Sequence, residues 1–425
     1  MENNRRVVIT GIGPFTSLGI GKEELWSNLL KGKIAVSPIP EKFKKNYSFR
    51  TKYYVPFPEY SFNDFDLSSR YTSLMEESSK VSLIGTKLAL DDAGLMGKEN
   101  TIEHYDPETI NIIIGVGIVC LQTIFDSYLV HNFEDRQDIL NTLDLKPLYN
   151  RMVIPSVMPN SASGWISIIY GVKGSNYTVN TACSSGSYAI GEAFRKIRDG
   201  YAEMLITGGA ECLKEKSGAV IRGFDMLDTL TKSSDGRPQP FSYDRSGFLF
   251  SEGGACIIIL EEYHKAVKRG ARIYAEILSY EANSDAYNII QIEPGGKQIK
   301  NLLNKITGGL HIDYINSHGT ATYLNDKTEC EVIREIFGNK ETQPLINSTK
   351  SLLGHTIGAS GSIEAAVTAL SIYESKVHPN LAENTFENLN LITHTHPADI
   401  RYALSTSYGF GGHNCALLLG KLEND

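Results

Sequence analysis

Residues 177–198 read YTVNTACSSGSYAIGEAFRKIR, and this stretch decides the fold class of the chain. It begins with a short β-branched run, Tyr177–Val179, which predicts a buried strand. A turn of small residues follows, and Ser187–Arg198 then shows helical periodicity and stops just before Gly200. A strand that turns directly into a helix is typical of α/β proteins with layered sheets.

The same alternation extends over the whole chain. Short apolar runs predict further strands at Val7–Thr10, Ile112–Val116, Met204–Thr207, Ala255–Leu260, Tyr314–Asn316 and Ala416–Leu419. Helical periodicity predicts helices over Leu74–Ala93 and Ser360–Tyr373. Because a run such as Cys256–Leu260 is apolar at every position, we expect sheets that are covered on both faces. No long linker divides the chain, and we place a soft boundary after residue 260, between residues 1–260 and 261–425.

The composition is that of a folded, soluble protein. The 425 residues include 41 Lys and Arg against 49 Asp and Glu, and the resulting net charge of −8 argues against a dedicated nucleic-acid binder. Six scattered cysteines without a CxxC pair fit a reducing compartment rather than a disulfide framework or a zinc site. No apolar stretch reaches the ~18 residues of a membrane span. We therefore expect a cytoplasmic protein that holds no metal.

Cys183 is the first candidate for chemistry, because it lies on the turn between the predicted strand and helix. A side chain there is presented at the carboxyl edge of a sheet and at the positive end of a helix dipole, which favours a thiolate over a thiol. Its small neighbours leave room for a substrate. A buried structural cysteine is the usual alternative, and we assign that role to the other five cysteines.

Three C-terminal segments carry further candidates. The segment NSHGTAT, Asn316–Thr322, places His318 in a loop directly after a predicted strand. The segment STKSLLGH, Ser348–His355, is followed by small residues and by a helix that carries Glu364. The segment YGFGGHN, Tyr408–Asn414, is rich in glycine, which suggests exposed backbone N–H groups or a mobile flap. Taken singly, these motifs support only a thiol-nucleophile enzyme with assistance from histidine.

Together the four segments resemble the condensing enzymes of the thiolase superfamily, specifically the β-ketoacyl-acyl carrier protein synthases of the elongating class. The resemblance covers essentially the whole chain, from VVITGIG at Val7–Gly13 to the closing GFGG loop. It implies a thiolase-like five-layered α-β-α-β-α fold of two similar halves. The nucleophile would lie in the N-terminal half, and the histidines and the gate loop in the C-terminal half. It also implies a dimer, and no cofactor beyond the 4′-phosphopantetheine of an acyl carrier protein.

The resemblance implies a catalytic role for five residues. Cys183 would take an acyl chain from the carrier protein. His318 and His355 would hold the thioester carbonyl of malonyl-carrier protein while it loses carbon dioxide and attacks the acyl chain. Lys350, five residues before His355, would pair with Glu364 and tune the imidazole. The Cys-His-His set differs from the Cys-His-Asn set of the initiating synthases.

The resemblance also implies binding roles around the nucleophile. The backbone N–H groups of Cys183 and Phe410 would form an oxyanion hole, and Phe410 would act as a gate. Thr320 and Thr322 would bind the pantetheine arm. The acyl pocket would include Ile118, Val119 and Cys120, although two glycines are common at the last two positions.

Departures from the family pattern bear on the pathway. Fatty-acid enzymes usually read HGTST followed by Pro, whereas Thr320–Asp326 reads TATYLND, which looks more like ketosynthase α subunits of bacterial type II polyketide systems. We therefore expect a polyketide or polyene pathway, with housekeeping fatty-acid elongation as the alternative. A non-catalytic chain-length factor would lack the cysteine at position 183, and a thiolase would carry a Cys-His-Cys set.

The partners follow from the same resemblance. We expect an acyl carrier protein and a dimer formed with a second copy or with a chain-length-factor-like subunit. The segment Ser69–Glu76, often basic in relatives and used for docking, keeps only Arg70. Docking would then depend on Arg195, Arg198 and Arg222, or on the partner subunit.

Overall fold

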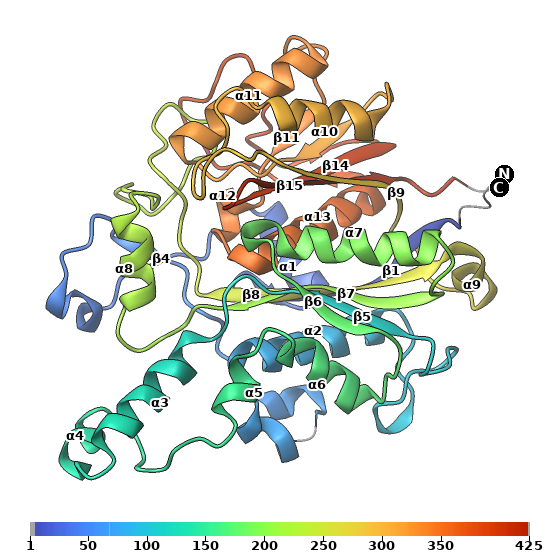
Figure 1. Cartoon of the computed structure of the whole chain (residues 1–425). Helices are drawn as coiled ribbons and strands as arrows, with labels where there is room; N and C mark the ends of the chain where they lie inside the picture. Colours follow the sequence, from blue (N-terminus) through green and yellow to red (C-terminus); the bar gives the residue numbers. More distant parts are fainter. Residues whose placement is uncertain (1–4, 68, 424–425) are drawn as a thin grey trace.

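Five layers of helices and strands stack in the order α-β-α-β-α (Figure 1). The structure is a computed structural model, and it describes residues 5–67 and 69–423. The first β layer contains β1 (Val7–Thr16), β5 (Asn111–Gly115), β6 (Asn176–Val179), β7 (Met204–Cys212) and β8 (Gly253–Glu262). The second contains β9 (Ala275–Ser284), β10 (Tyr314–Asn316), β11 (Leu345–Asn347), β14 (Tyr402–Gly409) and β15 (His413–Gly420).

Helices fill the three other layers. The central layer is made of α7 (Ser185–Arg198) and α13 (Ser360–Glu374), which contact strands of both β layers. One outer layer contains α2 (Glu77–Asp92) and α6 (Ser161–Tyr170), and the other contains α10 (Lys297–Thr307) and α11 (Tyr323–Phe337). The predicted fold class is confirmed.

The central layer is buried because its residues are small and apolar. In α13 every residue from Ser360 to Ile372 is buried, as expected for a helix that lies between two sheets. The two helices approach closely through glycine. A Cβ on Gly361 would lie 2.2 Å from Ser187 Oγ, and a Cβ on Gly186 would lie 2.7 Å from the backbone nitrogen of Ser362. Larger residues at these glycines would push the layer apart.

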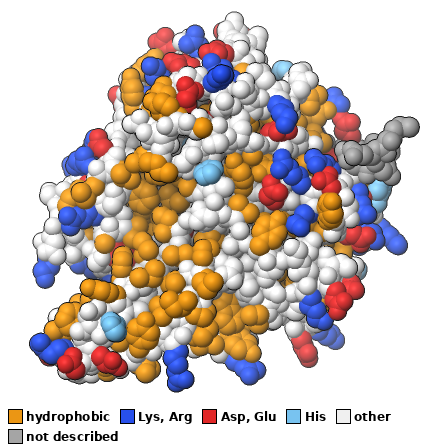
Figure 2. Space-filling model, in the orientation of Figure 1, with side chains coloured by type: hydrophobic (Ala, Val, Ile, Leu, Met, Phe, Trp, Pro, Cys, Tyr) orange, Lys and Arg blue, Asp and Glu red, His pale blue; other side chains and the backbone are white. Residues whose placement is uncertain are grey.

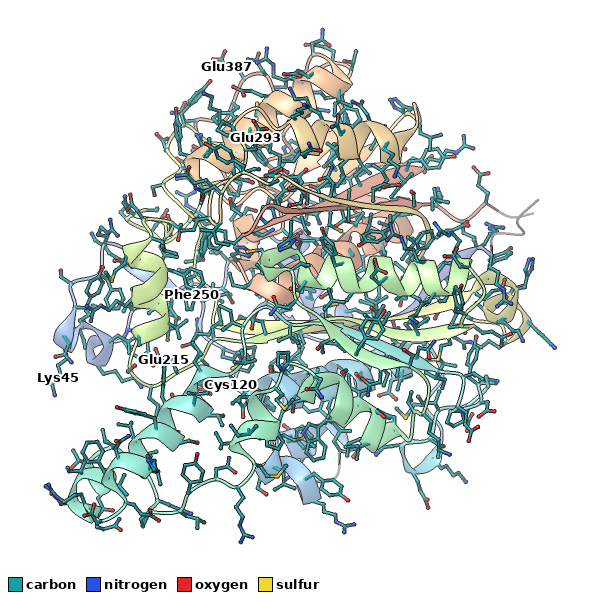
Figure 3. All side chains as sticks on the ribbon, in the orientation of Figure 1. Lys45, Cys120, Glu215, Phe250, Glu293 and Glu387 are labelled. Atoms are coloured by element: carbon teal, nitrogen blue, oxygen red, sulfur yellow. The ribbon has the colours of Figure 1, made fainter. Side chains whose placement is uncertain are left out.

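The two β layers belong to one hydrogen-bonded path of strands. They are joined where Val7, Val8 and Ile9 of β1 pair with Ala275–Ile277 of β9. The predicted boundary after residue 260 lies inside β8, so its position along the chain stays a prediction. Side chains fill the spaces between the layers, and one apolar cluster contains residues of both β layers and of both central helices (Figure 3).

The remaining elements are short or lie outside the layers. They include α1 (Lys22–Leu30), α3 (Leu121–Phe133), α4 (Gln137–Thr142), α5 (Val153–Val157), α8 (Ala219–Met226), α9 (Tyr263–Lys268) and α12 (Lys350–Leu353). Short strands are β2 (Gly19–Ile20), β3 (Ser37–Pro38), β4 (Tyr53–Tyr54), β12 (Lys376–Val377) and β13 (His396–Pro397). The 3-10 helices are η1 (Glu41–Asn46), η2 (Phe62–Phe65), η3 (Ser69–Leu74), η4 (Lys98–Asn100), η5 (Ala182–Ser184) and η6 (Ile357–Ala359). Within the described ranges, no helix has the length and apolar character needed to cross a membrane.

Candidate active site

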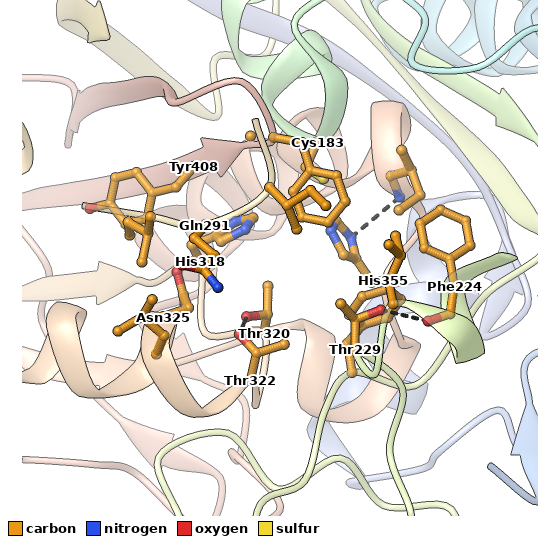
Figure 4. Close-up of a pocket in the computed structure, with 18 of the residues that line it drawn as sticks. Cys183, Phe224, Thr229, Gln291, His318, Thr320, Thr322, Asn325, His355 and Tyr408 are labelled. Atoms are coloured by element: carbon orange, nitrogen blue, oxygen red, sulfur yellow. Dashed lines mark hydrogen bonds between the residues drawn. The ribbon is translucent and has the colours of Figure 1, made fainter. Parts of the chain in front are cut away.

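A cavity of about 250 Å³ lies where the first turns of α7 and α13 meet the ends of several strands (Figure 4). Cys183 follows β6, His318 follows β10, and His355 follows β11 and α12. All three side chains line the cavity, together with Phe410 from the loop between β14 and β15. The structure therefore brings together four segments that are up to 227 residues apart along the chain.

The turn that carries Cys183 is strained and held by hydroxyl groups. Ala182 has a φ of 51°, a left-handed conformation that costs free energy in a residue with a side chain. Ser185 Oγ accepts from the backbone N–H of Thr181 at 2.9 Å and donates to the carbonyl of Ala182 at 2.7 Å. Ser184 Oγ donates to the carbonyl of Thr181 at 2.8 Å. This geometry presents the sulfur at the cavity, as expected of a nucleophile on a strand-to-helix turn.

Burial favours the thiol form of Cys183. Burial raises the pKa of Cys183 to about 11, although the backbone N–H of Phe410 and the charge of Lys350 act in the opposite direction. This direction is opposite to that expected from the helix end, because burial outweighs the groups that stabilise the negative charge.

His318 is held in one tautomer by Lys350. The ammonium Nζ of Lys350 lies 3.2 Å from His318 Nδ1 and 2.8 Å from the His318 carbonyl oxygen. Because an ammonium group only donates, Nδ1 accepts, and in the neutral ring the hydrogen is on Nε2. Lys350 also forms the predicted ion pair with Glu364. The imidazole that Lys350 contacts is thus that of His318, although Lys350 is nearer in sequence to His355.

His355 has the same tautomer for a different reason. Its Nδ1 accepts from the backbone N–H of Ile357 at 3.3 Å and lies 2.9 Å from Ser360 Oγ. Burial lowers the pKa of both imidazoles well below the usual range, and the charge of Lys350 adds to this effect. The two neutral rings, with centroids 5.7 Å apart, therefore each carry one Nε2–H donor.

The Gly-rich loop lies directly against the nucleophile turn. A Cβ on Gly409 would lie 2.5 Å from the carbonyl oxygen of Thr181 and 3.3 Å from the backbone nitrogen of Cys183. The next residue, Phe410, directs its backbone N–H to the Cys183 sulfur. Gly411 and Gly412 have φ values of 85° and 76°, which only glycine adopts readily.

Substitution of Gly409 by alanine is expected to slow acylation of Cys183 by about 10²-fold, because the added Cβ displaces the Phe410 N–H that faces the sulfur. The measurement is the rate of acyl transfer to Cys183, followed by intact mass spectrometry. Gly164→Ala is the matched control, since a Cβ there meets nothing within 4 Å. Equal rates in both variants would contradict the assigned contact.

Of the other predicted site residues, some line the cavity and others do not. Thr320 and Thr322 both line the cavity, and their hydroxyl oxygens are 2.9 Å apart. Ile118 packs on the apolar cluster that contains Cys183. Val119 and Cys120 are absent from the described lining of the cavity, and Cys120 is buried at the start of α3 (Figure 3). Their role in an acyl pocket stays a prediction.

Sequence reasoning missed two buried carboxylates. Glu211, the acidic residue near the end of β7, accepts from the backbone N–H of Ile118 at 3.1 Å and of Gly358 at 3.0 Å. It thereby ties the loop before α3 to the turn that follows His355. Glu329 accepts from the backbone N–H groups of His318 and Gly319, both at 2.9 Å. An acidic residue near the end of an apolar strand is the sequence signal that could have identified Glu211.

Burial is the main cause of the raised pKa of Cys183, and the negative charge of Glu211 adds to it. Because burial raises the pKa of Glu211 to about 8, this carboxyl is charged at pH 9 and is expected to slow the reaction of Cys183 there. Below a pKa of about 11, the thiolate fraction rises about tenfold for each pH unit. Glu211→Gln removes the charge and lowers the Cys183 pKa. Alkylation by iodoacetamide at pH 9 should then be about three times faster or more.

The control for Glu211→Gln is Glu215→Gln. Glu215 is also buried, but its carboxylate accepts from Ser217 in the loop before α8 and is not among the charges that act on Cys183. An alkylation rate that is unchanged in Glu211→Gln, or equally raised in both variants, would contradict the electrostatic role. Cys183→Ala identifies labelling at the other cysteines.

Within the described residues, no group of three or more His, Cys, Asp and Glu side chains is arranged to hold a metal ion. The polar groups that line the cavity include one thiol, two neutral imidazoles and the hydroxyls of Thr320 and Thr322. Such groups can attack an acyl carbon and can donate hydrogen bonds to an oxygen that becomes negative.

Comparisons with known proteins agree with this arrangement. Residues 4–266 match the sequence model described as "Beta-ketoacyl synthase, N-terminal domain", and residues 274–383 match "Beta-ketoacyl synthase, C-terminal domain". The chain is 34% identical to a curated protein of Synechocystis sp. and to one of Staphylococcus aureus strain COL, each named 3-oxoacyl-[acyl-carrier-protein] synthase 2. These alignments cover 99% of both chains in the first case and 100% of both in the second.

Solved structures show the same fold. The chain is similar to a β-ketoacyl synthase from Burkholderia phymatum, with a TM-score of 0.85 and 28% identity over 99% of this chain and 100% of the other. The ishigamide ketosynthase/chain length factor gives a TM-score of 0.84 at 26% identity, with the same coverage. A type II polyketide ketosynthase in complex with its acyl-carrier protein gives 0.81 at 26% identity, again with that coverage.

Proposed function

The chain belongs to the β-ketoacyl synthase family, and we propose that it uses Cys183, His318 and His355 to join a Cys-bound acyl chain to a malonyl unit on an acyl carrier protein. It is a ketosynthase, a C–C bond-forming acyltransferase like its curated relatives. One observation carries the assignment of roles. The thiol shares a buried cavity with two neutral imidazoles whose Nδ1 atoms are both engaged, so both Nε2–H groups remain for a substrate oxygen.

The first step is acyl transfer. The Cys183 sulfur attacks the thioester carbonyl of the acyl-carrier protein, and the carbonyl oxygen becomes an oxyanion. The backbone N–H groups of Cys183 and Phe410 are the donors placed for that charge. The C–S bond to pantetheine then breaks, and the pantetheine sulfur leaves with the proton that Cys183 gives up. Because the proton of Cys183 leaves with the pantetheine sulfur, a thiol with a raised pKa can act as the nucleophile.

The second step is decarboxylation. The thioester carbonyl oxygen of malonyl-carrier protein accepts hydrogen bonds from Nε2–H of His318 and of His355. The bond to the carboxylate breaks, carbon dioxide leaves, and the electron pair forms an enolate whose oxygen the two donors stabilise. The enolate carbon attacks the Cys183 thioester and releases the Cys183 sulfur. The product is a 3-oxoacyl chain that is two carbons longer.

Two pathways are compatible with this chemistry, and we propose fatty-acyl elongation as the first. The curated relatives at 34% identity are 3-oxoacyl-[acyl-carrier-protein] synthases 2, and they align over the full chain. The specialised pathway favoured by the sequence is the second candidate. It is supported by the motif Thr320–Asp326 and by the similarity to polyketide ketosynthases at 26% identity.

An elongation assay with defined acyl groups on a carrier protein distinguishes the two pathways. Purified enzyme is given malonyl-carrier protein and either a saturated long acyl chain or a polyenoyl chain on the same carrier. Faster elongation of the saturated chain would support fatty-acid synthesis, and faster elongation of the polyenoyl chain would support the polyketide pathway. Intact mass spectrometry must also show the acyl group on Cys183. Acylation that persists in Cys183→Ala would refute the mechanism in either pathway.

We also infer that two chains pair through β6. This strand ends the described path of the first β layer, and an unpaired edge exposes backbone donors and acceptors. The segments from α3 to α6 leave apolar side chains on the surface (Figure 2), among them Tyr128, Leu148, Ile154 and Ile168, each more than 60% exposed. Light scattering of the purified chain should give twice its 46.9 kDa. A monomer would favour assembly with a different subunit.

A further inference from the structure

Glu211 is a buried carboxylate that acts on Cys183 and is itself held by backbone N–H groups. Its side chain is fully buried near the end of β7, and within the described residues no Lys or Arg forms an ion pair with it. Burial raises the pKa of Glu211 to about 8, because the charged form is costly to bury. A charge of this kind is a candidate for a functional role, and its contacts indicate which one.

One side of the carboxylate holds the loop before α3. The backbone N–H of Ile118 lies 3.1 Å from each carboxylate oxygen, and the N–H of Gly117 also favours the charged form. The loop approaches so closely that a Cβ on Gly117 would lie 2.4 Å from Oε2. Ile118 packs on the apolar cluster that contains Cys183. Glu211 therefore fixes one wall of the space beside the nucleophile.

The same loop supports the turn that carries the nucleophile. Asn180 Nδ2 donates to the carbonyl of Gly117 at 2.9 Å, and Asn180 Oδ1 accepts from the backbone N–H of Ala182 at 3.3 Å. Ala182 is the residue of this turn with the left-handed φ of 51°. A displacement of the loop would therefore reach the Cys183 turn through a single side chain.

The other side of the carboxylate holds the turn after His355. The backbone N–H of Gly358 donates to Oε2 of Glu211 at 3.0 Å, and the preceding N–H, that of Ile357, donates to Nδ1 of His355. Ile357 has a φ of 50°, a left-handed conformation that is strained in a β-branched residue. Consecutive N–H groups thus bind Glu211 and the imidazole that faces the cavity (Figure 4).

We propose that Glu211 is a positioning residue, whose charged carboxylate holds both the pocket wall at Ile118 and the imidazole of His355 in place. This inference rests on the proposed function, because it concerns the alignment of groups that act in that reaction. A carboxylate only accepts hydrogen bonds, so it suits the N–H groups that converge on it. When the carboxyl is protonated, its O–H donates, and one N–H group loses its acceptor. The strained turn at Ile357 then relaxes, and Nε2–H of His355 moves out of line with the malonyl oxygen.

Other ionisable groups near Glu211 do not duplicate this role. The segments packed around it carry Glu76, Cys120, Cys183, Cys212 and His355. The charge of Glu76 adds to the raised pKa of Glu211. Burial also raises the pKa of Glu329 and of Glu364 to about 7, but Glu329 binds the backbone of His318, and Glu364 pairs with Lys350. A titration that disappears together with Glu211 is therefore separable from theirs.

The first test follows decarboxylation of malonyl-carrier protein in the Cys183→Ala background, which removes both the thiol and condensation. With Glu211 present, we expect kcat to rise about tenfold between about pH 6.5 and pH 9, with an apparent pKa of about 8. With Glu211→Gln, whose amide nitrogen donates where a carboxylate oxygen accepts, kcat should stay near the low-pH value. The KM should stay within about twofold. A general loss of packing would instead lower kcat equally at every pH.

The second test concerns the wall at Ile118 and uses an intact Cys183. The ratio of the acylation rates for hexanoyl- and tetradecanoyl-carrier protein cancels the reactivity of the thiol. We expect Glu211→Gln to change this ratio by about threefold or more at pH 9, because the pocket wall is no longer held. An unchanged ratio would overturn the part of the inference that concerns Ile118.

The matched control is Glu252→Gln. Glu252 is also buried, burial raises its pKa, and it accepts from the backbone N–H of Phe57, but it is outside the described lining of the cavity. A pH profile that is the same with and without Glu211, or an equal change in Glu252→Gln, would overturn the role at His355 and leave the proposed function intact. If Glu211→Gln loses its thermal transition, the Cys183→Ala enzyme decides alone, since a kcat that does not rise with pH overturns the inference. If that enzyme decarboxylates at no pH, the proposed function itself fails.

Discussion

Replacement of Cys183 by alanine is expected to abolish condensation while malonyl-carrier protein still loses carbon dioxide. Among the described residues that line the cavity, Cys183 is the one cysteine, so the variant has no thioester to accept the enolate. His318 and His355 remain, and their Nε2–H groups still stabilise the enolate. The enolate then takes a proton, and the product is acetyl-carrier protein.

Condensation in Cys183→Ala should fall by at least about 10³-fold, to the limit of detection. Mass spectrometry of the carrier protein follows both activities at once, since loss of carbon dioxide and chain extension give different masses. The alanine is tolerated because the site is already occupied by a small residue. If decarboxylation disappears together with condensation, the role assigned to the two histidines is wrong.

Loss of either histidine has the second largest expected effect. In His318→Ala or His355→Ala, the malonyl carbonyl loses one of two preorganised donors, and decarboxylation should fall by about 10²- to 10³-fold. The effect is expected in kcat rather than in KM, because the donor is needed most when negative charge forms. Measuring it in the Cys183→Ala background removes condensation from the result.

A glutamine at position 355 should recover part of this loss, because its side-chain amide presents an N–H near the place of Nε2. His378→Gln is the matched control: His378 is buried too, but it contacts Thr349 and the carbonyl of Pro379 and lies outside the described cavity lining. If His378→Gln lowers decarboxylation as far as His355→Ala, the loss reflects packing rather than donation. That outcome would remove the support for the two-donor site.

Much of the fold was predictable because each element has a simple pattern. The predicted strands and helices all form, and the boundaries differ where tertiary contacts intervene. The helix expected from Leu74 begins at Glu77, because the Glu76 carboxylate accepts from the backbone N–H groups of Ser78 and Ser79 and caps it. The strand expected to end at Thr10 continues to Thr16 through two glycines. A Cβ on Gly11 would lie 2.2 Å from the carbonyl of Ala89 in α2, so close helix packing explains the glycine.

The sequence predicts which residues form the candidate site better than it predicts their contacts and protonation states. Cys183 and His318 were marked by their places after predicted strands, and His355 by the small residues that follow it; the cavity unites the three. The contact of Lys350 with His318 joins residues 32 positions apart, and no spacing rule gives it. The thiol form of Cys183 depends on burial by several segments at once. Such effects arise from the folded arrangement as a whole.

The central helix layer has a consequence for chimeric enzymes. Gly186 and Gly361 let α7 of one half and α13 of the other touch at the level of backbone atoms. A chimera that combines the first half of this chain with the second half of a relative would therefore place a foreign surface in that contact. Substitutions at residues in such close contact do not have independent effects on stability. Recombination between relatives should succeed when α7 and α13 are inherited from the same parent.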